Sequence, residues 1–450
     1  RFGSRVDAMS VPEESSSEGG MSDSNDELDF TPGMTWWQAT FSLVVAVIGV
    51  GTMLLPQLPM KGGWCMSILS MLACYMAMTE SGIAMWKGIM AGNHADAKDL
   101  ASKAIVSYED FGKAAFGKTG EAAVLLVMML YFLGVLATLA VLVAEELENL
   151  IGHISKQDWL LAFAPIMILM SQLPNVKAVA KMTPLAVFCI LILVSVIISK
   201  SVLDAQRWQE WPDPAKLHRH WPQDPMAMGR VVASMFGAFS VNGNVPSILC
   251  EMKDPMEFPF AYKTAMAIAF CVYLAVMCCG YYGYGEFMQP DIVKSFSSFP
   301  ATEEQALNVK FGDWTGPKAL VLRGVCATLL LIQLIISLPL NMIVIYYSLQ
   351  TWEATKGCFP VGSCANRIMR VLVVVIAVVI GLAVPQFSSL FALVTSVCGP
   401  ILDCFLPIFL SYKIRQKHGA RMSSWVRRFA HALIVLLSLY CLTMGFYDSV

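Results

Sequence analysis

Charged side chains are scarce in this sequence: Asp, Glu, Lys and Arg make up 14% of its 450 residues, against about 25% in a soluble globular domain. A basic excess is also absent, because the formal net charge is −2, so nothing indicates a nucleic-acid partner. Most of the 13 cysteines lie inside apolar runs, where a thiol packs as a small hydrophobe. Only Cys358 and Cys364 share a loop, without the companion ligands that a zinc site needs.

Histidine is rare as well. The six histidines form no H-x-x-H spacing and no other metal-ligand pattern. Membrane-embedded enzymes need clusters of catalytic side chains facing a cavity, and the sequence offers no such cluster. We therefore expect no enzyme activity, no metal site and no cofactor.

Apolar residues are abundant, at 56% of the chain. A helix needs about 20 apolar residues to cross a hydrocarbon core. Eleven runs of roughly that length predict an all-α integral membrane protein: Met34–Met60, Gly62–Trp86, Ala122–Ala144, Trp159–Val176, Met182–Ser199, Val231–Cys250, Thr264–Gly285, Gly324–Trp352, Val371–Val384, Phe387–Tyr412 and a last one within Arg428–Tyr447. Residues 1–33 are rich in Ser, Glu and Asp, and we expect a disordered tail without a secretory signal peptide.

The distribution of Lys and Arg predicts the orientation. With the N-terminus in the cytoplasm, the inside loops hold 18 Lys plus Arg, about twice the number in the outside loops. The short outside loops 57–63 and 145–158 carry one Lys each. We therefore expect a multi-pass protein of a plasma membrane or a vacuolar or lysosomal membrane, with a cytoplasmic N-terminus.

Two of the predicted spans are interrupted at mid-membrane. Gly49, Gly51 and Pro56 break the first span, and the sequence Asn242-Gly243-Asn244-Val245-Pro246 breaks the sixth. Irregular backbone survives in lipid only where protein or a water-filled cavity shields it. The two breaks lead two blocks of five helices, which is the pattern of inverted-repeat transporters.

This pattern predicts one transporter domain over residues 34–447, divided into repeat one (34–199), repeat two (229–412) and an extra helix (428–447). The released amides and carbonyls of broken helices suit the carboxylate and ammonium of an amino acid. We expect the substrate to be bound by residues of the two breaks and by two aromatic walls: Gly49, Val50, Gly51, Thr52, Val241, Asn242, Gly243 and Asn244, with Tyr131 and Phe239.

Three sequence stretches resemble a known family. Gly49 to Pro56 followed by Gly63-Trp64, Glu251 to Pro255 with Phe258, and the helix-ten pairs at 390–391, 399–400 and 406–407 are similar to motifs of the amino acid/auxin permease family. The resemblance covers residues 34 to about 447. It implies a LeuT-like fold with eleven helices and amino acid transport coupled to H⁺ or Na⁺.

The coupling ion is where the sequence departs from the family pattern. Sodium-dependent members often carry Asn before the first-helix glycines, but this chain has Val45 to Ile48 there. Many proton-linked members carry His in the helix-six break, where this chain has Asn242. We expect H⁺ rather than Na⁺ to be the coupling ion.

Four polar residues within the spans are candidates for ion coupling. Ser337 and Asn341 flank Pro339 in the eighth span, Glu80 lies in the second and Asp403 in the tenth. Ionisable groups inside a membrane are costly and are functional candidates by default. Helix packing, hydrogen bonding to the helix backbone, or a structural ion pair is the alternative for each of them.

The best interpretation is a secondary active transporter of neutral amino acids, because no intramembrane acid adjoins the breaks to hold a cationic side chain. A non-transporting amino acid sensor on the same scaffold, a Na⁺-coupled carrier and an uncoupled carrier stay open as alternatives. The expected partners are an amino acid and the lipid bilayer. The sequence leaves the particular amino acid, the direction of transport and the oligomeric state undetermined.

Overall fold

The computed structural model describes residues 33–49, 51–96, 105–172, 183–205, 218–222, 224–289, 291–296, 317–352, 355, 357–360, 362–384, 386–420 and 424–449. The regular secondary structure over these residues is helical, apart from one isolated β-bridge between Met34 and Met252. The predicted disordered tail lies outside the described residues except for Gly33.

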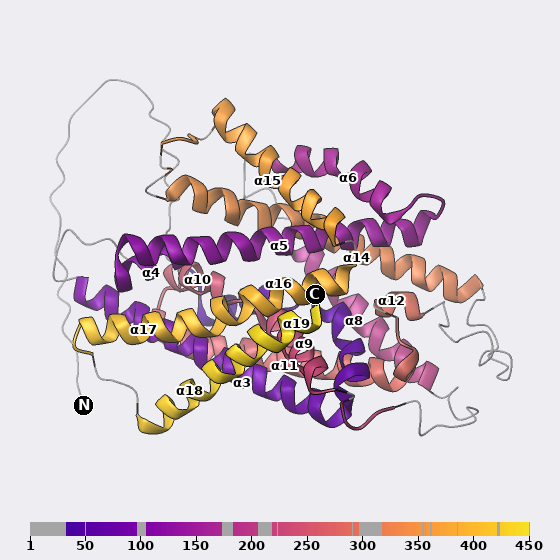
Figure 1. Ribbon diagram of the computed structural model, residues 1–450, viewed down its shortest axis with the longest axis horizontal. Helices are drawn as coiled ribbons and strands as arrows, with labels where there is room; N and C mark the ends of the chain where they lie inside the picture. Colours follow the sequence, from indigo (N-terminus) through magenta and orange to yellow (C-terminus); the bar gives the residue numbers. More distant parts are fainter. Residues whose placement is uncertain are drawn as a thin grey trace.

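The first half of the chain forms a sequence of long helices with one early break (Figure 1). Ser107 and Ser155 begin two of them as N-caps, because each hydroxyl accepts a hydrogen bond from the amide three residues later. The elements are α1 (Trp36–Val47), α2 (Gly51–Leu54), η1 (Leu55–Gln57), α3 (Leu58–Asp96), α4 (Tyr108–Phe116), α5 (Lys118–Ile151), α6 (Lys156–Ser171) and α8 (Thr183–Ala205).

The second half also begins with a broken helix and ends with a helix that follows α17. It starts with α9 (Pro225–Phe239), η4 (Asn242–Asn244) and α10 (Val245–Glu251). The remaining elements are η5 (Pro255–Glu257), α11 (Phe258–Tyr284), η6 (Gly285–Phe287), α12 (Ile292–Ser295), α14 (Pro317–Thr351), α15 (Cys364–Ala383), α16 (Phe387–Pro400), η7 (Ile401–Phe405), α17 (Leu406–Lys417), α18 (Trp425–Tyr440), η8 (Cys441–Gly445) and α19 (Phe446–Ser449).

Each expected span has a helical counterpart. Eight spans within the described residues are long and apolar enough to cross a membrane. The first of them runs from α2 through η1 into α3, with a kink at Gly63, whose φ of 65° is left-handed. The other expected spans correspond to α1, α6 and the α9–α10 pair. Helices α1 and α9 are short because each ends at a break, and α6 has only 16 residues. The count of eleven therefore stays a prediction.

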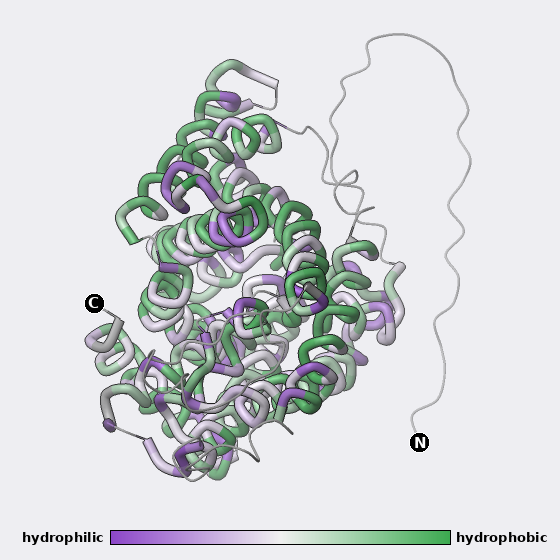
Figure 2. The backbone as a smooth tube through the Cα atoms, turned by 90° about the vertical axis from the view of Figure 1, so that its right-hand side faces the viewer, coloured by the Kyte–Doolittle hydropathy of each residue, from purple (hydrophilic) through white to green (hydrophobic). Residues whose placement is uncertain are grey.

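The outer surface of the bundle is apolar. Large hydrophobic side chains lie exposed on its faces, including Leu169, Leu126, Val379 and Leu436. The helices are correspondingly hydrophobic over most of their length (Figure 2). So much exposed apolar surface is unfavourable in water and is matched by lipid tails. The chain is a multi-pass integral membrane protein.

One helix, α11, lies at the centre of the packing. It contacts α1, α3 and α8, and its tyrosines Tyr262, Tyr273 and Tyr281 are fully buried. At the two ends of the bundle lie short helices from the connectors: α4 packs beside the first turns of α5, and α12 lies near its other end (Figure 1). The central helix thereby brings the two broken segments together, and the connectors cover the ends.

Candidate functional site

The first break separates α1 from α2. Helix α1 ends at Val47, and Ile48 has extended backbone dihedral angles before the helix resumes at Gly51. Gly51 lies directly against α9: a Cβ atom added there would come within 2.8 Å of Ala238 Cβ and 2.9 Å of Ala238 Cα. Only glycine therefore lets the two broken helices approach so closely at this point.

The second break separates α9 from α10. Helix α9 ends at Phe239, a single 3₁₀ turn covers 242–244, and Pro246 lies in the first turn of α10, where its missing amide hydrogen is harmless. The glycine here is less crowded. A Cβ atom added to Gly243 would meet only Phe132 side-chain atoms, the nearest at 3.7 Å.

One hydroxyl group joins the two breaks. Tyr273 Oη on α11 lies 2.6 Å from the carbonyl oxygen of Val47, the last residue of α1, and 2.9 Å from that of Ala238, near the end of α9. Its ring packs edge-on against Phe239, with 5.0 Å between centroids. Helix ends leave carbonyl groups without a helical partner, and this tyrosine serves both of these ends.

A cavity of about 570 Å³ lies between the breaks. Its lining combines small, aromatic and neutral polar side chains and includes no Asp, Glu, Lys or Arg among the described residues. The residues that surround the breaks on this lining are Gly49, Gly51, Ser240, Val241, Gly243 and Asn244, with Tyr131 and Phe132 from α5 and Gln333, Ser337 and Asn341 from α14.

The cavity extends from the breaks towards one side of the bundle. On α1 it reaches Phe41 and Ser42, on α8 it follows residues 186–191, and on α14 it continues to Val344. These segments belong to the half of the bundle that holds the N-terminus of α1. On the opposite side Gly280 lies against Pro56 and Ile292, so the short helix α12 covers the far end of the first break.

The polar residues of α14 form a small cluster on the cavity wall. Gln333 Nε2 donates to Ser337 Oγ at 2.9 Å, and Asn341 Nδ2 donates to the Ser337 carbonyl oxygen at 2.9 Å. The second contact is the bond to the helix backbone that the sequence left open as an alternative. Gln333 Oε1 is buried without a partner among the described residues, which leaves an acceptor in the cavity wall.

Asn242 faces away from the cavity, into a fully buried polar network. Its Nδ2 donates to the Asp403 carbonyl oxygen at 2.6 Å and to Ser81 Oγ at 2.9 Å, and its Oδ1 accepts from Tyr262 Oη at 2.8 Å. Its backbone amide donates to Asp403 Oδ1 at 3.3 Å. The amide released by the second break is thus used by a protein carboxylate, and the expectation that no intramembrane acid adjoins the breaks is wrong at Asp403.

Asp403 itself lies on η7, a π-helical turn between α16 and α17, and is completely buried. Single π-turns inside helices often occur at functional sites. The hydroxyl of Ser240, which lines the cavity, lies next to the Asp403 carboxyl group and the Tyr131 hydroxyl. Ser240 therefore connects the cavity to the buried acid.

Glu80 lies elsewhere. Its Oε1 atom is 2.5 Å from Arg427 Nε and 3.5 Å from His431 Nε2, both on α18. The glutamate joins α3 to the extra helix, and it is not among the residues that line the cavity. This contact is the structural ion pair that the sequence left open as the alternative for Glu80.

Apart from Glu80 and Val50, the predicted residues separate into two groups. Gly49, Gly51, Tyr131, Val241, Gly243, Asn244, Ser337 and Asn341 line the cavity. Thr52, Phe239, Asn242 and Asp403 are buried beside it, and Val50 lies outside the described residues. Tyr273, Ser240 and Gln333 belong to the site but were not predicted from the sequence. In the sequence each of these three residues is only a polar side chain within an apolar run, and that pattern does not predict which groups the side chain contacts.

Two broken helices around a central cavity, in an all-helical membrane bundle, are the arrangement of LeuT-like transporters. A family model described as "Transmembrane amino acid transporter protein" matches residues 32–450, so the chain belongs to that family. The resemblance seen in the sequence motifs is thereby confirmed.

Curated relatives agree with this assignment. The chain is 22% identical over 429 residues to amino acid transporter AVT1C of Arabidopsis thaliana, covering 94% of this chain and 70% of that protein. It is 23% identical over 388 residues to AVT3A from the same plant, covering 82% of this chain and 79% of that protein. For AVT1D, also from that plant, the chain spans 60% of the relative's length.

Solved structures share the fold. A manganese transporter of Eremococcus coleocola, in complex with an aromatic bis-isothiourea substituted compound, has a TM-score of 0.56 at 12% identity, covering 94% of this chain and 91% of that one. A mutant of the same transporter has a TM-score of 0.51 at 14% identity, covering 93% of this chain and 96% of the mutant. These similarities show the fold of the chain alone.

Proposed function

We propose that this protein carries neutral amino acids across a membrane by alternating access, with H⁺ as the coupling ion. The observation that carries the proposal is the cavity between the two breaks, which reaches one side of the bundle and is covered on the other. Family membership and the names of the relatives support an amino acid as the substrate.

The cavity supports a neutral substrate. A cationic or anionic side chain loses its hydration on entry and needs an opposite charge to compensate. The described lining supplies none, whereas it offers hydrogen bonds from Ser240, Asn244, Gln333 and Asn341. We infer that the substrate's carboxylate and ammonium are held by backbone and neutral polar groups of the breaks, and that aromatic rings of α5 pack against its side chain.

Alternating access requires that the site opens to one side at a time. The cavity opens along α1, α8 and α14 on the side of the α1 N-terminus, which the Lys and Arg distribution assigns to the cytoplasm. The structure then corresponds to an inward-facing state. The opposite state would require α12 to separate from Pro56 and the outer end of the bundle.

Proton coupling is supported by Asp403. It lies behind Ser240, within the network of the second break, and no basic side chain takes part in the hydrogen bonds described for its carboxyl group. A proton gained or lost there changes the charge beside the amide of Asn242 and therefore the hydrogen bonds that hold the break. Sodium finds less support, because residues 45–48 on the cavity wall are all apolar.

Uptake into proteoliposomes tests the proposal. Purified protein is reconstituted, and uptake of radiolabelled alanine, glutamine, leucine, arginine and glutamate is measured in sodium-free buffer, with and without an imposed pH gradient. We expect saturable uptake of at least one neutral amino acid that the gradient accelerates several-fold, and much weaker uptake of arginine and glutamate.

Other outcomes would select the alternatives. Saturable binding without flux would contradict transport and indicate a sensor. Uptake that ignores the pH gradient but depends on Na⁺ would indicate a sodium-coupled carrier, and uptake indifferent to both would indicate an uncoupled one. Preferred uptake of arginine or glutamate would contradict the neutral-substrate assignment.

A further inference from the structure

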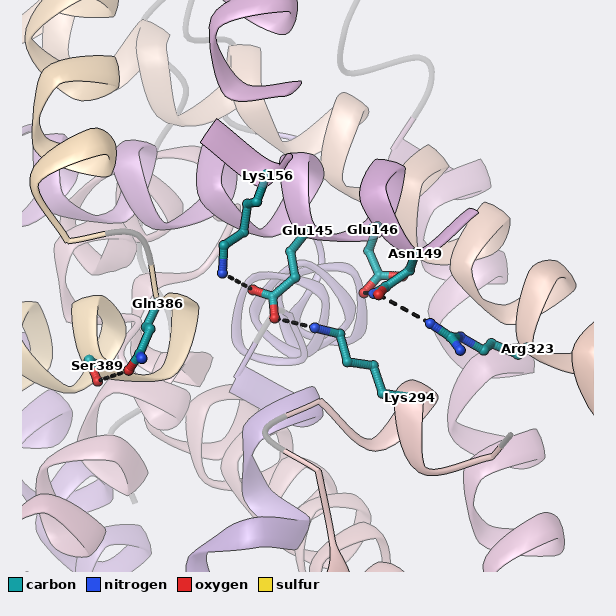
Figure 3. A network of polar contacts seen from close by, with 8 residues as sticks. All are labelled: Glu145, Glu146, Asn149, Lys156, Lys294, Arg323, Gln386 and Ser389. Atoms are coloured by element: carbon teal, nitrogen blue, oxygen red, sulfur yellow. Dashed lines mark hydrogen bonds and ion pairs between the residues drawn. The ribbon is translucent and has the colours of Figure 1, made fainter. Parts of the chain in front are cut away.

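Three carboxylic acids are buried together at the outer end of the bundle. Glu145 and Glu146 lie in the last turns of α5, and Asp291 directly precedes α12. Their exposed fractions are 6%, 0% and 1%. Figure 3 shows the two glutamates between the end of α5 and the connector that carries Lys294. Buried acids must be paired with cations, hydrogen-bonded, or protonated.

Glu145 is paired with cations. Its Oε1 atom forms an ion pair with Lys294 on α12, and its Oε2 atom lies 3.8 Å from Lys156 at the start of α6 (Figure 3). The carboxylate therefore bridges two connectors. This pair ties α12 to α5 electrostatically at any pH at which both partners are charged.

Glu146 and Asp291 instead face each other. Both side chains are buried where the Glu145–Lys294 ion pair joins α5 to α12, and they lie close enough to act on each other. Glu146 Oε1 accepts from Asn149 Nδ2 at 3.4 Å, and Asp291 Oδ1 accepts from the amide of Val293 at 3.1 Å. The remaining oxygens, Oε2 and Oδ2, are buried without a donor among the described residues.

Two adjacent buried carboxylates repel each other, and a proton on one of them removes the repulsion and supplies the donor that their unpartnered oxygens lack. The neighbouring titratable and charged groups are Glu145 on the same helix, Lys294 on α12, Lys156 on α6, and Arg323 and Cys326 on α14. Arg323 reaches the pair through Asn149, whose Oδ1 it contacts at 3.1 Å. Burial raises the pKa of the Asp291 carboxyl group, which favours the same proton.

The position of Asp291 makes this proton mechanically important. The short helix α12 contacts α2 and α14 and buries Ile292, Val293 and Phe296 completely or almost completely. Asp291 begins this helix, and Ile292 lies with Pro56 against Gly280. Anything that separates Glu146 from Asp291 therefore also lifts α12 from the outer end of the first broken helix.

We propose that Glu146 and Asp291 form a proton-binding site that holds α12 closed over the outer end of the transport path. The inference rests on the proposed function in one respect, because it gives the closed α12 the role of an outer gate. The ligand is a single proton shared by the two carboxyl groups, and it is distinct from a proton carried at Asp403.

The direction of the pH effect follows from proton counting. The closed gate holds one proton on the pair, whereas an open gate exposes both acids to water, where they ionise at neutral pH. The closed state therefore binds one more proton. Acidification therefore favours closure, and alkaline conditions favour opening. The equilibrium constant for opening changes by up to about tenfold per pH unit within the range between the pKa of the pair in the open state and its pKa in the closed state.

Hydrogen–deuterium exchange of the full-length protein in lipid nanodiscs tests the proposal. The peptide that covers residues 288–296 reports on α12. After correction for the intrinsic pH dependence of exchange, we expect its protection in the wild type to fall several-fold to about tenfold per unit as the pH rises. The variants E146Q and D291N each supply an amide donor in place of the proton, so both should protect α12 at all pH values.

The matched control is E145Q. It removes a buried charge next to Glu146 but also the ion pairs with Lys294 and Lys156, so α12 should lose protection at every pH and retain the pH dependence. Peptides from the middle of α5 report whether each variant is folded. Wild-type protection of α12 that does not change with pH, or an unchanged pH dependence in a folded E146Q or D291N protein, would overturn the proton site. Neither result depends on amino acid flux, so the transport proposal stands or fails separately.

Discussion

The backbone amide of Asn242 lies 3.3 Å from Asp403 Oδ1, so the second broken helix is tied to the π-turn of the tenth predicted span. The side-chain amide of Asn242 also donates a hydrogen bond to the backbone carbonyl oxygen of Asp403. The sequence predicted that this break binds the substrate. In the structure Val241, Gly243 and Asn244 line the cavity, whereas Asn242 binds the buried Asp403. Any change in the charge of Asp403 acts directly on the shape of the break.

Replacing Asp403 by Asn should uncouple transport from protons. Asn keeps an oxygen to accept from the Asn242 amide but cannot bind or release a proton in the physiological range. We expect D403N to lose most of the acceleration by a pH gradient while exchange of internal for external amino acid continues. Paired measurements of gradient-driven uptake and counterflow in proteoliposomes check this.

Glu80 provides the control for this variant, because it is an acid within a predicted span that pairs with Arg427 and not with the break. E80Q should retain the response to the pH gradient. Equal loss of coupling in both variants would indicate a general effect of removing a membrane acid and would count against a special role of Asp403.

The two break glycines should differ in their tolerance of a methyl group. At Gly51 a Cβ atom would lie 2.9 Å from backbone Cα of Ala238, which cannot move aside without shifting α9. At Gly243 the nearest atom is 3.7 Å away on the Phe132 ring, an ordinary contact. We expect G51A to reduce the maximal uptake rate at least tenfold and G243A to stay within about twofold of wild type.

Thermal unfolding in detergent accompanies these uptake measurements. Overpacking of a tight contact costs about 1–3 kcal/mol, so G51A should remain foldable. Equal activity of the two alanine variants would mean that the close approach of α2 and α9 is not needed for transport.

The sequence was sufficient for features that depend on local composition. The breaks were predicted because Gly49, Gly51 and Pro246 release backbone groups wherever they occur in a span. The spans followed from the apolar runs, since hydrophobic length alone decides what can cross a bilayer. Family membership followed from motifs around the same breaks.

The contacts of the site depend on how distant helices cross, which one sequence does not reveal. Tyr273 was one tyrosine among several in its span, and nothing near it in the sequence shows that its hydroxyl reaches Val47 and Ala238. Asn242 was expected in the cavity, but a helical turn places its side chain on Ser81 and Asp403. Asn242 lies 161 positions from Ser81 and from Asp403, and Tyr273 lies 226 positions from Val47. Contacts over such separations depend on the packing of helices and not on the local sequence.

Two exposed cysteines can test the predicted orientation. Cys358 lies between α14 and α15 and Cys364 is the first residue of α15; both are free thiols, and the Lys and Arg distribution predicts that this connector is in the cytoplasm. A membrane-impermeant maleimide added to intact cells should leave both unlabelled, and labelling should appear after permeabilisation. Peptide mass spectrometry identifies the two sites. Full labelling in intact cells would reverse the orientation and turn the inward-facing cavity into an outward-facing one.

Removing the Tyr273 hydroxyl should slow the conformational cycle more than it weakens the fold. In Y273F the ring still packs on Phe239, but the carbonyl oxygens of Val47 and Ala238 lose their shared donor. A buried polar group left without a partner costs about 1–3 kcal/mol, although water from the adjacent cavity can replace part of that bond. We expect a modest fall in thermal stability and a larger fall, of about tenfold, in the maximal uptake rate, with a smaller change in the substrate concentration for half-maximal uptake.

This asymmetry between rate and half-maximal concentration arises because the Tyr273 hydroxyl holds the two broken helices relative to each other and does not line the cavity. A variant that changes only the half-maximal concentration would instead assign Tyr273 to substrate binding.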